Sequence, residues 1–250
     1  MRAAEVRAGA FAMPRTSPSY PVGPYAYARR EYLTVTYRTD PEAAAAVIPA
    51  PLRPGPPEVR FQFVRVPDST GFGDYAMALQ ILPVLTPEGQ EAGYVHGSYV
   101  NSHTANAAGR ELWGFPHKLA APSLAVERDT LVGTLSFGPV PVARATMGFK
   151  HRALKEEAAL AELQAPGVLL KIIPHVDGKP RICELVRFRM SGVRFHGGWS
   201  GPAALDLLPH GLAPVAELPV RGVLSATHLL ADCVLEHGSV IHDYLRGRGA

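Results

Sequence analysis

Short runs in which hydrophobic and polar positions alternate recur along the chain, and this alternation predicts strands. Residues 31–37 (Glu-Tyr-Leu-Thr-Val-Thr-Tyr) alternate in this way and are rich in β-branched and aromatic side chains. The same criteria predict strands over residues 59–66, 76–84, 93–100, 168–173, 181–188 and 193–196, a hairpin over 130–137 and 140–147, and a mixed strand and loop over 220–234. So many short, closely spaced strands indicate a protein rich in β-structure.

Three segments instead predict brief helices. Asp40 is a favourable N-cap, Pro41 suits a first helical turn, and the Ala-rich run that follows ends before Pro49. Residues 154–163 (Leu-Lys-Glu-Glu-Ala-Ala-Leu-Ala-Glu-Leu) have the clearest helical pattern, and residues 202–208 predict a third, shorter helix.

The predicted elements favour one domain. Strands and helices do not alternate as βαβ units, so a doubly wound sheet is not expected, and the predicted fold class is β-rich α+β. Residues 1–24 are rich in Pro and Ala without periodicity, which predicts a loosely ordered N-terminal arm. Residues 25–250 are predicted to form a single domain.

Composition narrows the class of protein. Hydrophobic residues make up 47% of the chain and charged residues 19%, which argues against disorder. The net charge is only +3 and the basic residues are scattered, so a nucleic-acid surface is not indicated. The N-terminus lacks a continuous apolar core and no run approaches a membrane span, so we expect neither export nor membrane insertion.

The two cysteines and ten histidines suggest no special site. Cys183 and Cys233 stand in unlike contexts, so we expect reduced, packed thiols and a cytoplasmic protein. The histidines lack the ligand spacing of recognisable metal sites, and no metal is predicted.

Several motifs occur in an order that is specific. They are residues 38–42 (Arg-Thr-Asp-Pro-Glu), 109–116 (Gly-Arg-Glu-Leu-Trp-Gly-Phe-Pro), 145–150 (Ala-Thr-Met-Gly-Phe-Lys), 170–174 (Leu-Lys-Ile-Ile-Pro) and 177–185 (Asp-Gly-Lys-Pro-Arg-Ile-Cys-Glu-Leu). Together they closely resemble the acetoacetate decarboxylases, over roughly residues 17–245.

The resemblance implies a fold and a chemistry. It implies a cone-shaped antiparallel β-barrel with a few peripheral helices, a homo-oligomer, and a mostly apolar cavity that needs no cofactor. In that family a lysine forms a Schiff base with a β-keto acid, and acetoacetate decarboxylase is a standard example of a lysine activated by its surroundings. A lyase that acts on a small-molecule carbonyl substrate is therefore the starting expectation.

This sequence departs from the family pattern at the lysine pair. The pair falls at positions 117 and 118, so His117 stands where the Schiff-base lysine is expected and Lys118 matches the second lysine. Neighbouring residues of a strand point to opposite faces, so only one of these two side chains is expected to face the cavity.

Three more positions of the family site also differ. The two family glutamates fall at Gln62 and Met77, and a cavity methionine falls at Ser98, whereas the family arginine is kept as Arg30. Loss of a lysine together with both carboxylates suggests a rebuilt cavity, because a buried carboxylate without a cation is unfavourable.

These departures predict an enzyme that works without a covalent lysine. We expect cyclisation, dehydration or isomerisation of an apolar, polyketide-like carbonyl substrate in secondary metabolism, and not true acetoacetate decarboxylation. His117 is the expected acid or base near neutral pH, with Arg30 and Gln62 in support. The expected substrate-binding residues are Met77, Ser98, Tyr99, Phe115 and Lys118.

Other interpretations stay open from the sequence. A local bulge could turn Lys118 inward and restore Schiff-base decarboxylation, or an aldol condensation with dehydration. The cavity could also serve only to bind an apolar carboxylate or ketone without turnover. His117 could simply be a packed, hydrogen-bonded residue.

Overall fold

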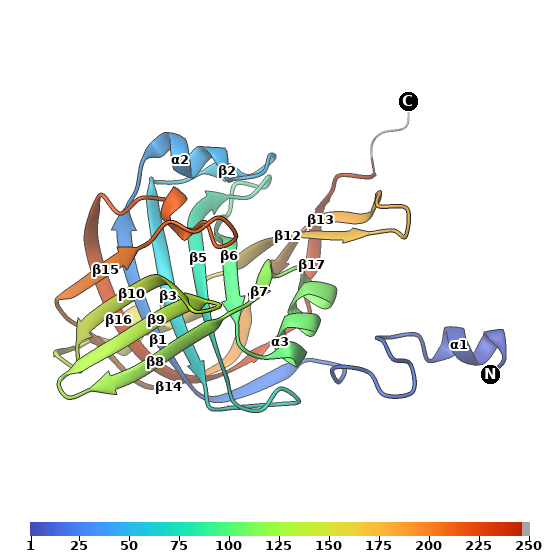
Figure 1. Cartoon of the computed structure of the whole chain (residues 1–250), viewed down its shortest axis with the longest axis horizontal. Helices are drawn as coiled ribbons and strands as arrows, with labels where there is room; N and C mark the ends of the chain where they lie inside the picture. The colour runs from blue at the N-terminus through green and yellow to red at the C-terminus, as the bar shows by residue number, and fades with distance from the viewer. Residues whose placement is uncertain (247–250) are drawn as a thin grey trace.

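A computed structural model describes residues 1–246 and consists mainly of two antiparallel-rich sheets (Figure 1). The larger sheet has the strand order β11 (Arg152–Ala153), β14 (Met190–Ser200), β16 (Gly222–Leu235), β1 (Tyr25–Arg38), β3 (Glu58–Val66), β5 (Tyr75–Leu85), β6 (Glu91–Val100), β12 (Gly167–Pro174), β13 (Pro180–Phe188) and β17 (Ser239–Asp243). Off this path, β2 (Arg53–Pro54) pairs with β5, β4 (Asp68–Ser69) pairs with β1, and β7 (His117–Leu119) pairs with β6. The smaller sheet has the order β15 (Ala203–Leu207), β10 (Val140–Gly148), β9 (Thr130–Phe137) and β8 (Ala121–Glu127).

Short helices accompany the sheets. They are α1 (Ala3–Ala8), α2 (Pro41–Ala46), α3 (His103–Ala108), which continues into a π-helical turn (Gly109–Trp113), α4 (Glu156–Gln164) and a 3-10 turn (Val215–Glu217). The β-rich class with few helices is therefore confirmed. In residues 1–246 the strand path of the larger sheet ends at β11 on one side and at β17 on the other, without closing on itself.

Most predicted elements are present, and one helix is wrong. The helices predicted after Asp40 and near residues 154–163 correspond to α2 and α4. Residues 202–208, predicted as helical, instead contain β15, which pairs with β10 in antiparallel register and buries Leu205 in the core. Pairing with a distant strand overrides the local preference there.

The two faces of the larger sheet have different surroundings: one packs against the smaller sheet and the other faces a cavity. On one face of β1, Leu33, Val35 and Tyr37 are fully buried, and they pack toward the smaller sheet with Phe61 and Phe63 of β3. Gly133 of β9 allows this close approach, because a Cβ atom there would lie 2.5 Å from the Phe63 ring. The opposite face of the same strands is left free to build a cavity.

The N-terminal segment lies apart from the sheets. α1 buries none of its residues and projects away from the sheets (Figure 1). Tyr20 is buried and donates a hydrogen bond to Glu111, so the segment is attached just before β1 begins at Tyr25. The boundary predicted at residue 24 coincides with the start of β1, whereas residues 247–250 of the predicted domain lie outside the described residues.

Membrane insertion was not expected. Among residues 1–246, none of the helices combines the length and the apolar character that crossing a bilayer requires.

Candidate functional site

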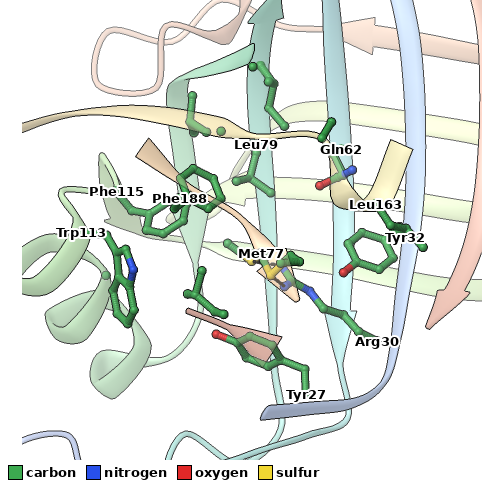
Figure 2. Close-up of a pocket in the computed structure, with 18 of the residues that line it drawn as sticks. Tyr27, Arg30, Tyr32, Gln62, Met77, Leu79, Trp113, Phe115, Leu163 and Phe188 are labelled. Carbon is green, nitrogen blue, oxygen red and sulfur yellow. Dashed lines mark hydrogen bonds between the residues drawn. The ribbon is translucent and has the colours of Figure 1, made fainter. Parts of the chain in front are cut away.

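A cavity of about 110 Å³ lies against the free face of the larger sheet. Strands β1, β3, β5 and β6 form one wall, and the end of α4 with the start of β12 forms another. Figure 2 shows the aromatic and aliphatic side chains that line it, which include Tyr27, Tyr32, Leu79, Trp113, Phe115, Leu163 and Phe188. Such a small, mainly apolar space suits a ligand of few atoms.

Strand register aligns one row of side chains beneath this cavity. Residues paired across neighbouring strands point to the same face of a sheet. The pairing runs through Thr227, Thr34, Gln62, Leu79, Ser98 and His117, in that order. The row therefore brings together residues from six strands that are far apart in the sequence.

His117 is held rigidly within this row. Its side chain is buried, its Nδ1 atom lies 2.7 Å from Ser98 Oγ, and its ring stacks on Phe115 with centroids 5.1 Å apart. Gly109 is required beside it, because a Cβ atom there would lie 2.5 Å from His117 Nε2. Arg110 donates a hydrogen bond of 3.0 Å to the His117 carbonyl oxygen.

The environment of His117 keeps it uncharged. Burial, and then the nearby Arg110 charge, lower the pKa of His117 to about 3. The imidazole is therefore neutral near pH 7, where the sequence had suggested a group that titrates. The expected pKa of His117 differs from the one in the structure because an alternating sequence pattern cannot show that both the imidazole ring and its hydrogen-bond partner are buried.

Arg30 is a buried cation without an anionic partner among residues 1–246. Its side chain is only 5% exposed, and its guanidinium carbon lies 4.8 Å and 5.0 Å from the ring centroids of Tyr27 and Tyr32. In the described part of the chain, Nη2 and Nη1 form hydrogen bonds only with the sulfur atoms of Met77 at 3.4 Å and Met190 at 4.0 Å, and Nε has no hydrogen-bond partner. Figure 2 shows the side chain extending past the two rings toward Met77. Within residues 1–246 no carboxylate forms an ion pair with Arg30, although a buried cation is costly without a partner.

The remaining predicted site residues divide into two groups. Gln62, Met77 and Phe115 line the cavity, and Gln62 Nε2 donates a 3.0 Å hydrogen bond to Thr34. Ser98 contacts the cavity residue His117 through its hydroxyl group.

Two predicted substrate-binding residues lie outside the cavity. Lys118 pairs with Tyr99, so both point to the face opposite His117. The Lys118 ammonium donates a 2.7 Å hydrogen bond to the Leu212 carbonyl, and Tyr99 packs in the core against Phe137. A side chain one residue from a cavity residue on a strand is directed away from it.

Two charged residues of the cavity were missed from the sequence. Glu162 of α4 and Arg60 of β3 both line it. Burial raises the pKa of Glu162, and hydrogen bonds from Thr34 and Thr227 and the charge of Arg60 oppose this shift. Burial lowers the pKa of Arg60, and Glu162 opposes that shift.

The sequence did contain a signal for Glu162. It lies three positions after Ala159, which is buried, and one before Leu163, so it belongs to the inward face of α4. A carboxylate on the apolar face of an amphipathic helix is unusual.

Comparison with known proteins places the chain in a family. The family model described as acetoacetate decarboxylase (ADC) matches residues 12–245. Acetoacetate decarboxylase 2 of Mesorhizobium japonicum is 57% identical over 96% of this chain and 92% of its own length, and the acetoacetate decarboxylase of Acidiphilium cryptum is 55% identical over 98% and 100%. The crystal structure of the Legionella pneumophila acetoacetate decarboxylase is 41% identical, covers 98% of both chains and superposes with a TM-score of 0.92.

These relatives correct the functional interpretation of the sequence. The expectation of a lysine-free cyclase, dehydratase or isomerase that is not a true acetoacetate decarboxylase is wrong, because relatives 52–57% identical over nearly the whole chain are acetoacetate decarboxylases. The alternative that kept β-keto acid decarboxylation agrees better with them. The expectation of family membership, by contrast, is confirmed: this chain belongs to the acetoacetate decarboxylase family.

Proposed function

We propose that the protein decarboxylates acetoacetate or a similarly small β-keto acid. The observation that carries this proposal is Arg30, a buried guanidinium with free donors and no carboxylate partner in the described chain, which lines a small apolar cavity. The full-length similarity to acetoacetate decarboxylases supports the same conclusion.

Arg30 suits an anionic substrate for a physical reason. A buried cation is costly without a partner, and a bound carboxylate removes that cost while forming charge-assisted hydrogen bonds. The cavity volume of about 110 Å³ favours a substrate of few carbon atoms over a polycyclic one. The apolar walls exclude water from the carboxylate that is lost.

A Schiff-base route needs an amine, and Lys118 is our candidate. None of the residues that line the cavity is a lysine, but Lys118 is adjacent to His117 on β7, which has only three residues and pairs with β6. A one-residue shift of this short strand would exchange the two side chains between the faces. The shift would cost Lys118 its bond to Leu212 and His117 its bond to Ser98.

Lys171 is the competing amine. Burial lowers the pKa of Lys171, which favours a nucleophilic neutral amine, and Glu184 opposes the shift. Its ammonium donates a 2.9 Å hydrogen bond to the carbonyl oxygen of Leu112, which precedes the cavity residue Trp113 in the chain.

The test measures acetone and carbon dioxide released from acetoacetate, with borohydride trapping and peptide mapping of the adduct. We expect turnover and an adduct on Lys118 that is lost in Lys118→Ala, with Lys179→Ala, an exposed lysine, as the matched control. An adduct on Lys171 would keep the function and reassign the amine. Folded protein that releases no carbon dioxide would refute the proposed function.

The cone-shaped barrel and the homo-oligomer implied by the family belong to the same proposal. The curved larger sheet is consistent with a cone around the cavity (Figure 1). Light scattering of the purified protein tests the oligomer, and a monomeric mass under assay conditions would contradict it.

A further inference from the structure

Glu162 brings a carboxyl group into the cavity from a helix, where the sheet itself supplies none. The side chain comes from α4, which packs against β14, and it lines the same cavity as Arg30. Thr227 Oγ1 lies 3.1 Å from both of its carboxyl oxygens. The family resemblance assigned two carboxylates to positions 62 and 77, and both positions now hold uncharged residues.

A short hydrogen-bond relay orients this carboxyl group. Gln62 Nε2 donates to Thr34 Oγ1 at 3.0 Å, which leaves the Thr34 hydroxyl proton free to point elsewhere. That hydroxyl also lies near the Glu162 carboxyl group and lowers the pKa of that group. Gln62, Thr34 and Thr227 lie in one cross-strand row, so the sheet register fixes the position of the carboxyl group.

The position of Glu162 favours a bound proton. It lies in the last turn of α4, where the partial negative charge of the helix end disfavours an anion, and no basic residue lies in that turn. Desolvation acts in the same direction and raises the pKa of Glu162. Arg60 is the charged group that opposes it, and the two threonine hydroxyls are its other polar neighbours.

We propose that Glu162 is the proton donor of the cavity, which protonates the α-carbon after carbon dioxide has left. The proposal rests on the proposed decarboxylase function. It assigns substrate binding and product formation to different groups: Arg30 binds the substrate anion, and Glu162 protonates the α-carbon to form the product.

The step balances in atoms and charge. The bond between the α-carbon and the carboxylate breaks, carbon dioxide leaves, and the electron pair moves toward the carbonyl oxygen or, in a Schiff base, the iminium nitrogen. The α-carbon then takes the proton of the Glu162 carboxyl group. The resulting carboxylate recovers one proton from solvent, so that acetoacetate and one proton give acetone and carbon dioxide.

Two assays separate this role from the overall function. The first measures carbon dioxide release from acetoacetate, and the second measures exchange of acetone methyl protons in D₂O by NMR, which needs proton transfer but no decarboxylation. The variants are Glu162→Gln, Glu162→Asp and the control Glu157→Gln, which changes an exposed glutamate of the same helix. Circular dichroism and thermal melting confirm that each variant is folded.

Proton donation predicts a specific order of activities. We expect Glu162→Gln to slow both reactions by roughly 100-fold or more, which is the usual contribution of general acid catalysis. Glu162→Asp, which keeps a transferable proton, should lose less, and Glu157→Gln should match the wild type. A merely structural role would favour Gln, the closer match in shape, so a Gln variant as active as the Asp variant overturns the proposal.

The assays also distinguish failure of the two proposals. If the wild type releases carbon dioxide and Glu162→Gln stays within about 3-fold in both assays, the function stands and the role of Glu162 is refuted. If the wild type releases none, the function fails, and proton exchange still decides the other question. Exchange that is lost in Glu162→Gln then supports Glu162, and absence of exchange in the wild type refutes it.

Discussion

The Nδ1 atom of His117 lies 2.7 Å from Ser98 Oγ, across the parallel pairing of β7 with β6. This contact is enclosed, with His117 5% and Ser98 1% exposed. The ring is thereby held at one orientation under the cavity. Because it is uncharged at neutral pH, its contribution there is a fixed hydrogen bond and a flat apolar surface.

The burial of His117 predicts acid sensitivity of the fold. The pKa of His117 is lowered from 6.5 to about 3, so between these values the unfolded chain binds a proton that the folded chain does not. Stability therefore rises with pH in this window, and it falls as the pH drops below about 6.5, by an amount on the order of a few kcal/mol by pH 4. Urea unfolding of the wild type and His117→Asn at pH 7 and pH 4.5 measures this.

The variant provides the contrast. Asparagine keeps a polar group near Ser98 but does not titrate, so its stability should fall less between the two pH values. An equal loss in both proteins would show that other groups dominate the acid response.

Gly109 is predicted to be intolerant of any side chain. A Cβ atom at this position would lie 2.4 Å and 2.5 Å from two atoms of the His117 ring, which is itself packed against Phe115. Gly109→Ala should lower the free energy of unfolding by about 1–3 kcal/mol, the usual cost of overpacking. Adding His117→Ala should recover most of that loss, because the clash then disappears, and a double-mutant cycle by thermal unfolding measures the coupling.

The sequence predicted the strands of the sheet better than the residues of the site. Alternation predicted β1 and β3 well, because one face of each strand is packed into a core of Leu33, Val35 and Phe63. It also predicted that His117 and Lys118 would point apart. Which of the two enters the cavity depends on the register of β7 with β6, and that register joins segments about twenty residues apart, which no local pattern contains.

The missed features have similar physical causes. Residues 203–207 form a strand because β10 offers them a partner, and Glu162 lines the cavity because α4 packs against β14 and brings this side chain to Thr227 of β16. The functional interpretation failed for another reason. It took changes at four positions to mean a different reaction, and it did not consider that a carboxyl group could reach the same cavity from a different element.

Arg30 is predicted to control substrate affinity. Arg30→Met fills a similar volume but removes the charge, so it should relieve the buried cation while losing its hydrogen bonds to a bound carboxylate. Hydrogen bonds to a charged group contribute about 1.5–3 kcal/mol, which predicts a loss of roughly 10- to 150-fold in kcat/KM for acetoacetate. The unfolding free energy should be unchanged or slightly higher.

A matched control separates binding from net charge. Arg144→Gln removes a cation from an exposed ion pair with Asp206 in the smaller sheet, and it should leave kcat/KM unchanged. Neutral acetone, measured as an inhibitor, should bind the Arg30 variant about as well as the wild type. A variant that keeps full kcat/KM for acetoacetate would contradict the role of Arg30 as the anion receptor.

Thr34 is predicted to position Glu162 through its hydroxyl group. Thr34→Val keeps the shape of a side chain that is only 2% exposed, but it leaves the Gln62 amide without its acceptor and removes a hydroxyl group near the Glu162 carboxyl group. Loss of a buried hydrogen bond with one partner retained costs about 1–3 kcal/mol, whereas removing both partners is nearly neutral. Thr34→Val should therefore destabilise the fold, and adding Gln62→Leu should restore most of the stability. Acetone proton exchange should remain slow in the double variant, because Glu162 is then held only by Thr227. A double variant that regains both stability and exchange would show that the relay supports the fold alone.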